Sequence, residues 1–180
     1  ADDWRALLKH QPDDLESLQA LSDIYEGLED WSPWTEVVAR RLDLNEATDH
    51  PLRLRFADVL GTHLDQHERA GEQLSQVLGQ DDVSAVLLER LAEIALSLGL
   101  SDTAAMALER AAASESDESL RLYRRVVEVY RDIIGSPDEA RTAWEAIAEL
   151  TGGDSDSYEA LGDIYRRSKL FSELVELHEK

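Results

Sequence analysis

A five-residue pattern recurs along the chain at a constant spacing of 35 residues. Each copy has a large apolar residue, a mostly small one, an acidic one, a β-branched apolar one and a mostly aromatic or apolar one. The copies occupy residues 21–25, 56–60, 91–95, 126–130 and 161–165. Since the register never slips, the pattern predicts tandem units that share one local structure.

Each unit is long enough for two helices, and the composition favours helix over strand. The 180 residues include nine Gly, four Pro and two Phe and are rich in Ala, Leu, Glu, Asp and Arg. We expect first helices near residues 13–27, 49–62, 84–98, 117–133 and 155–168. We expect second helices near residues 2–10, 33–45, 66–79, 102–114, 137–151 and 172–180. The predicted fold class is all-α, made of tandem helix–turn–helix repeats.

Short polar residues and prolines mark several expected helix starts. Ser32 and Ser136 each precede a proline, which suits a capping hydroxyl followed by a first helical residue that needs no N–H. Ser136 with Glu139 fits a capping box, and Asp13 with Glu16 fits a looser version of it.

The turns between helices are too short to separate domains, so we expect one repeat array over residues 1–180. It comprises a half repeat at 1–11 and repeats at about 12–46, 47–81, 82–116, 117–151 and 152–180. Both ends fall in second helices that carry apolar residues, such as Trp4 and Leu174, rather than a polar capping face. We therefore expect the segment to be part of a longer protein with further repeats on either side.

The repeat resembles the tetratricopeptide repeat family, in which two-helix units carry small and aromatic residues at fixed places. The family's small position on the first helix corresponds to Ser22, Ala57, Ala92, Val127 and Gly162, and its aromatic position to Tyr25, Leu60, Ala95, Tyr130 and Tyr165. The small position that opens the second helix corresponds to Thr35, Ala70, Ala105, Ala140 and Val175. The resemblance covers essentially the whole chain and implies a right-handed α-solenoid with a 35-residue period.

The charge and composition exclude several classes of function. With 39 acidic and 18 basic residues the net charge is −21, which disfavours nucleic acid and anionic membranes as partners. The chain has no Cys, no apolar run of the roughly 20 residues that cross a bilayer and no leader-like N-terminus, so we expect a cytoplasmic protein. Arg greatly outnumbers Lys, as is typical of GC-rich bacterial genomes.

The resemblance implies that the first helices line a concave groove, where outward-facing residues would contact a partner. One such position is acidic in every repeat, and its members are Asp23, Asp58, Glu93, Glu128 and Asp163. They are predicted to bind a basic or amine-bearing peptide. The structural alternative is that each carboxylate pairs with an arginine one turn away or on the next unit, as Glu128 does if it meets Arg124 and Arg131.

Arginines cluster on the expected first helices of the fourth and fifth repeats, at 117–133 and 155–168. Among them, Arg124, Arg131 and Arg166 are candidates to bind a partner's carboxylates. The alternative is a solvated face that balances neighbouring acids. Trp4 and Trp144 share one repeat position, which favours packing over an aromatic cage. His63 and His67 straddle an expected turn, so a metal site is not predicted.

The chain contains no Gly-rich phosphate loop, nucleophile elbow or His-Glu-x-x-His motif, so neither catalysis nor a cofactor is expected. The leading hypothesis is a non-catalytic scaffold that binds a segment of another protein in the concave groove. Self-association through the uncapped ends is a further expectation. The alternatives are an RNA-binding helical-repeat protein, or the regulatory or docking region of a larger enzyme.

Overall fold

The computed structural model describes residues 2–44, 49–114 and 117–178, and within these ranges all regular structure is helical. The chain divides into two compact units, Ala1–Val83 and Ser84–Lys180. None of the described helices has both the length and the hydrophobicity needed to span a bilayer.

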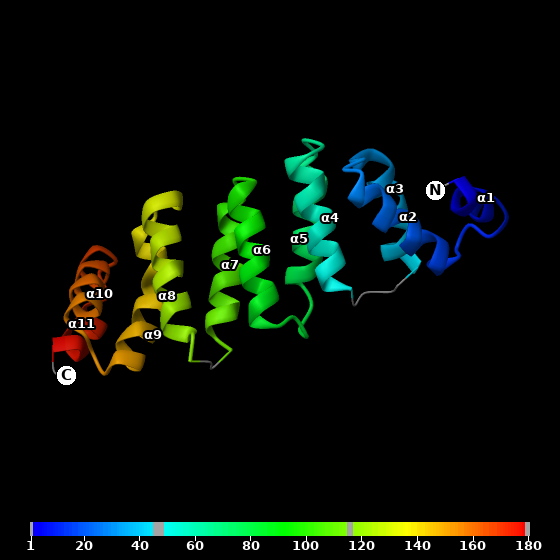
Figure 1. Cartoon of the computed structure of the whole chain (residues 1–180). Coiled ribbons are helices and arrows are strands. Elements are labelled where there is room, and N and C mark those ends of the chain that lie inside the picture. The colour runs from blue at the N-terminus through cyan, green and yellow to red at the C-terminus, as the bar shows by residue number, and fades with distance from the viewer. Residues whose placement is uncertain (1, 45–48, 115–116, 179–180) are drawn as a thin grey trace. The chain divides into compact units, whose positions relative to one another are not determined.

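The first unit contains five helices, each packed against the next along the chain (Figure 1). They are α1 (Asp2–His10), α2 (Leu15–Gly27), α3 (Trp31–Leu44), α4 (His50–Thr62) and α5 (His67–Leu78). Their core contains Trp34, Leu60 and Leu74, each at most 1% exposed. Both α2–α3 and α4–α5 are helical hairpins.

The second unit continues the alternation, with consecutive helices again in contact (Figure 1). Its α-helices are α6 (Ala85–Ser97), α7 (Ser101–Ala112), α8 (Ser119–Glu128), α9 (Arg141–Thr151), α10 (Ser155–Arg167) and α11 (Phe171–His178). A π-helix, η1 (Val129–Ile134), extends α8, and a 3₁₀ turn, η2 (Pro137–Ala140), leads into α9. The predicted helices are confirmed in both units, apart from these two segments and a few residues at the ends; residues 45, 179 and 180 of the predictions lie outside the described residues.

Four of the first helices begin at equivalent caps, whose side-chain oxygens accept a hydrogen bond from the backbone N–H three residues later. These caps are Asp14, Asp49, Ser84 and Asp154. The capping role predicted for Asp13 is therefore wrong, because Asp13 instead accepts a hydrogen bond from Arg40 Nη2 at 2.6 Å.

Neither of the two predicted serine caps uses its hydroxyl, although Ser136 does hold the predicted N-cap position before Pro137. Ser32 lies inside α3, which begins one residue earlier, and its carbonyl accepts a hydrogen bond from Thr35 Oγ1. At Ser136 the carbonyl, not the hydroxyl, accepts the Glu139 N–H at 3.0 Å, because the tight 3₁₀ turn brings that N–H onto the backbone.

A shared turn connects each first helix to its second helix. Just beyond the turn, a backbone N–H donates a hydrogen bond to the carbonyl of the residue at the fifth position of the repeated five-residue pattern. The residue before this donor has a positive φ. The positive-φ residues are Glu29, Asp65, Gly99, Gly135 and Lys169. In the second and fourth repeats the donor lies one residue further along, at Gln66 and Ser136. Residues 129–134 absorb the extra residue as a π-helix, which explains why the expected helix over 117–133 is not uniformly α-helical.

The small positions expected from the family resemblance are buried at nine of their ten places. Ala57, Ala92, Ala70 and Ala105 are all 0% exposed, so the paired helices approach closely through them. Val175 differs, because its side chain is 57% exposed on α11, whose packing partner is α10.

Three tyrosines at the aromatic position reach back to the preceding second helix. Arg5 Nε donates to Tyr25 Oη at 2.7 Å, while the hydroxyls of Tyr130 and Tyr165 donate to Glu109 at 3.1 Å and Glu145 at 3.0 Å. Burial, and then the neighbouring glutamate, raises the pKa of Tyr130 and of Tyr165 to about 12. These contacts join successive repeats.

Replacing Gly162 or Gly153 of the second unit with alanine should have opposite effects on the free energy of unfolding. A Cβ at Gly162 would lie 3.5 Å from Arg166 Nη2 and 3.9 Å from Leu177 Cδ2, which are ordinary contacts. We expect Gly162→Ala to raise the free energy of unfolding by about 0.5–1 kcal/mol, because glycine in a helix loses more backbone entropy. Gly153 has a φ of 87° and its Cβ would clash with the Tyr158 ring, so Gly153→Ala should cost about 1–3 kcal/mol.

Urea unfolding followed by circular dichroism measures both changes. A loss of stability in Gly162→Ala would show that the α10–α11 contact has no room for a methyl group.

The buried tyrosine hydroxyls predict a loss of stability in alkali. The pKa of Tyr165 is higher in the folded chain, at about 12, than its ordinary value of 10.0. Its stabilising contribution is therefore complete below about pH 10 and is lost as the pH rises through 12. We expect the free energy of unfolding to fall across this window, and the Tyr130→Phe/Tyr165→Phe variant to show a shallower fall. An identical pH profile in the variant would contradict the assignment.

Candidate functional site

The five acidic residues of the predicted ladder lie on α2, α4, α6, α8 and α10. Four of them contact a polar side chain on their own helix. Gln19 donates to Asp23 at 2.7 Å, Arg55 to Asp58 at 3.1 Å, Arg90 to Glu93 at 3.2 Å and Arg166 to Asp163 at 2.7 Å. Three of these partners are arginines, as the structural alternative expects.

The pairing expected around Glu128 is not formed. Arg124 instead lies 4.0 Å from Asp154 at the start of α10, and Arg131 binds both carboxylate oxygens of its neighbour Asp132 at 2.7 and 2.8 Å. The hydrogen bond to Asp132 and, to a smaller extent, the charge of Glu128 raise the pKa of Arg131.

Two adjoining hollows lie where α8, η1 and η2 meet α9 and α10. One has a volume of about 310 Å³ and includes Arg124, Glu128 and Asp154 in its lining. The other, of about 140 Å³, includes Asp163 and Arg167. Val127, Arg131 and Trp144 line both. We call the two together the α8–α10 groove.

The groove combines an apolar floor with charges of both signs. Trp144 and Val127 contribute the floor, while three arginines and four carboxylates form the rim; these are Arg124, Arg131, Arg167, Glu128, Asp154, Asp156 and Asp163. Hydrogen bonds from Ser157 lower the pKa of Asp154, and the nearby charge of Arg124 acts in the same direction. The three guanidinium groups are more than half exposed. Such a surface suits a ligand that carries both charged and apolar groups.

The structure thus brings four of the predicted site residues together in one groove: Arg124, Glu128, Arg131 and Asp163. Arg166 lies on α10 but outside the groove lining, Glu93 lies on α6, and Asp23 and Asp58 belong to the first unit.

Sequence reasoning missed Trp144 as a groove residue. It was assigned to packing, and it does pack against the buried cluster of Leu161, Ile164 and Tyr165 while also lining both hollows. Arg167 belongs, with Arg166, to the arginine cluster predicted on the fifth of the first helices; its Nη2 lies 2.9 Å from Asp138.

The aromatic and histidine residues of the first unit make packing contacts. Trp34 is 1% exposed, and the rings of Trp31 and His63 stack with centroids 4.5 Å apart. His67 Nε2 lies 2.8 Å from Asp65. Within the described ranges no group of three or more histidine and acidic side chains is arranged to hold a metal ion.

Comparison with known proteins gives a likeness in fold. No family model and no curated protein matches the sequence. Among solved structures, MamA aligns with a TM-score of 0.52 and 19% identity over 92% of this chain and 88% of MamA. YrrB, a TPR protein with an unusual peptide-binding site, aligns with a TM-score of 0.50 and 14% identity over 97% of this chain and 88% of YrrB. Together with the repeated hairpins, these likenesses identify the chain as having a tetratricopeptide-repeat-like fold.

Proposed function

We propose that the chain is a non-catalytic scaffold that binds a segment of a partner protein in the α8–α10 groove. The observation that carries the proposal is the convergence of Arg124, Glu128, Arg131 and Asp163 around the half-buried Trp144. Arg124 and Glu128 lie on α8, Arg131 lies on η1, Trp144 on α9 and Asp163 on α10, so a segment that crossed the groove would meet residues of several elements.

The chemistry of the groove supports a peptide as the occupant. An apolar side chain would cover the Trp144 ring and Val127, and burial against an aromatic floor is a common source of affinity at interfaces. The arginines would bind carboxylates, while Asp154, Asp156 and Asp163 would bind basic groups. This mixed rim suits a segment with charges of both signs.

Binding of such a segment would require some ion pairs within the groove to be replaced by ion pairs with the partner. The Arg124–Asp154 and Arg167–Asp138 pairs are solvent-exposed, and exposed pairs contribute little to stability. Replacing them with pairs to a partner therefore costs little, and the gain comes from water excluded around Trp144. The peptide-binding site of YrrB, a protein of similar fold, is consistent with the same use here.

Other parts of the proposal concern the rest of the chain. Within their own units, Asp23 and Asp58 of the first and Glu93 of the second are proposed to favour a basic partner. The protein is proposed to act in the cytoplasm without a cofactor, with self-association through its ends as a second kind of partner.

Site-directed photocrosslinking tests whether a partner binds in the groove. Because the chain lacks cysteine, a crosslinker can be attached at a single introduced thiol. A benzophenone attached at Glu128→Cys should capture a partner from an extract of the source cells. The same group at Glu36→Cys, an exposed position of α3, should not. Absence of any adduct specific to position 128 would overturn the proposal.

The captured partner then allows an affinity measurement. Charge reversal in Arg124→Glu/Arg131→Glu should weaken binding about tenfold or more, equivalent to about 1.4 kcal/mol, because two guanidinium contacts become repulsive. The control Arg40→Glu/Arg69→Glu makes the same change in net charge at exposed sites of the first unit and should bind normally. Circular dichroism verifies that both variants fold. Equal affinity of the two variants would place the partner elsewhere.

A further inference from the structure

Another hollow of the second unit lies between α9, α10 and α11. Ala160, Ile164 and Arg167 face the groove, whereas Tyr158, Leu161 and Tyr165 line a separate hollow with α9 and α11. Residues at spacings of three, four and seven lie close together on a helix, so each set forms a stripe along α10. The two stripes adjoin at Leu161 and Ile164, which belong to one buried cluster. This hollow has a volume of about 460 Å³.

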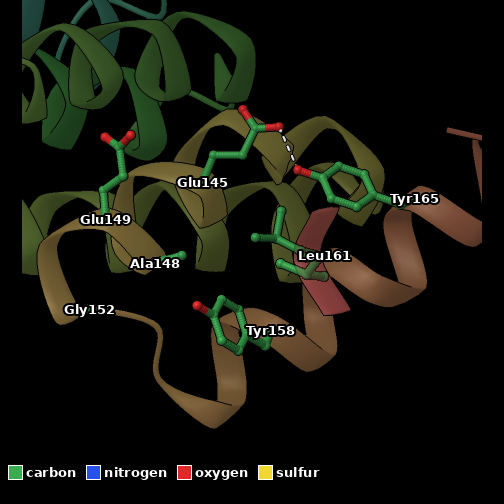
Figure 2. A pocket seen from close by; sticks show the side chains of 8 residues that line it. Glu145, Ala148, Glu149, Gly152, Tyr158, Leu161 and Tyr165 are labelled. Atoms are coloured by element: carbon green, nitrogen blue, oxygen red, sulfur yellow. Dashed lines mark hydrogen bonds between the residues drawn. The ribbon is translucent and has the colours of Figure 1, made fainter. Parts of the chain in front are cut away.

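The hollow has an apolar floor, aromatic walls and an acidic side. Leu161 lies between the rings of Tyr158 and Tyr165, and the carboxylates of Glu145 and Glu149 project from α9 (Figure 2). Both tyrosines belong to α10. The two glutamates lie one turn apart, which places their charges on the same face of α9.

The walls of the hollow are held in position by specific contacts. The hydroxyl of Tyr165 donates to Glu145 Oε1 at 3.0 Å (Figure 2). Tyr158 lies against Gly153, where the absence of a Cβ leaves room for the phenol ring. The site is therefore largely formed before any ligand arrives, which lowers the entropy lost on binding.

The charge of this hollow favours a cation. The contact of Arg141 Nε with Glu145 is 3.8 Å long and involves Oε1, the oxygen that also accepts from Tyr165. Glu149 is exposed and forms no ion pair with a described residue. A ligand whose alkyl stem packs on Leu161 and whose cationic end lies at these carboxylates would match both the apolar and the acidic part of the lining. The faces of the tyrosine rings would add cation–π attraction. A wholly apolar ligand would desolvate the carboxylates without compensation.

A neighbouring hollow indicates that the ligand is a chain segment and not a free amine. It has a volume of about 360 Å³ and shares Glu149 with the first. Its lining is mainly Ala112, Ala113, Ala146, Leu150 and Tyr123. The Leu150 side chain is 54% exposed there, so an apolar group placed beside it would remove apolar surface from water.

We propose that these two hollows form a second peptide site, distinct from the α8–α10 groove, that takes a lysine side chain beside Tyr158 and an apolar side chain beside Leu150. Glu149 lies between the two and contacts the basic residue of the bound segment. The site adds a second kind of recognition to the chain, selective for a basic residue close to an apolar one.

Nuclear magnetic resonance titration of the isotope-labelled full chain tests the site. The probes are capped short peptides with Lys and Leu adjacent or separated by one Gly, in both orders. Millimolar peptide should shift the amide signals of Ala148, Gly152 and Gly153. The matched peptide with norleucine in place of Lys should bind about tenfold more weakly, because it lacks the charge for Glu145 and Glu149.

Variants assign the binding to this surface. Glu149→Gln should weaken the lysine peptide about fivefold, while Glu159→Gln, an exposed position of α10 outside both hollows, should leave the affinity unchanged. The groove variant Arg124→Glu/Arg131→Glu should also bind the lysine peptide normally, so failure of the groove proposal and failure of this one are distinguishable.

Any of the following results would overturn the inference. One is the absence of shifts at Ala148, Gly152 and Gly153 with every lysine peptide. Another is equal binding of the lysine and norleucine peptides, or of the wild type and Glu149→Gln. The third is cadaverine binding as tightly as the best peptide, which would show a site for a free diamine instead of a chain segment.

Discussion

The close approach of paired helices through buried small residues is the constraint on which the other features depend. Ala57, Ala70, Ala92 and Ala105 are fully buried within the α4–α5 and α6–α7 hairpins. A larger side chain at such a place would force the helices apart and disturb their contacts with the next hairpin. Because these positions recur in register, each repeat presents equivalent faces to solvent. Binding residues can therefore vary on those faces while the packing between helices is retained.

The periodicity of the sequence was sufficient to predict the helices, because each repeat confirms the phase of the others. Helix ends were less predictable, since a cap depends on the backbone angles of one residue. Asp13 and Asp14 are chemically identical, yet Asp13 lies in the preceding turn, whereas Asp14 has the extended backbone of a cap and its carboxylate accepts the Ser17 N–H. The π-helix at 129–134 likewise arises from one extra residue before the turn, which the five-residue pattern does not reveal.

The candidate site was predicted in part, for a related reason. A repeat pattern shows which positions are equivalent, but the partner of a charged side chain depends on distances across helices. Arg124 and Arg131 were correctly placed near Glu128 on the same helical segment, but their nearest carboxylates belong to Asp154 and Asp132. Trp144 was interpreted as a packing residue because it shares a position with Trp4. The repeat pattern does not reveal that Trp144 also lines the groove.

The net charge of −21 acts on both proposed surfaces, although they differ in local chemistry. Long-range attraction draws basic segments towards the chain, but at physiological ionic strength it is screened beyond about 8 Å. Selection between surfaces must then come from contacts within a few ångströms. In the α8–α10 groove the arginines offset the carboxylates, so burial on Trp144 carries more weight. Beside Tyr158 the charge of Glu149 is not offset by a described cation, so a basic group is favoured there. Because the two hollows are lined by different residues of α10, this one helix contributes to two kinds of recognition that can change independently.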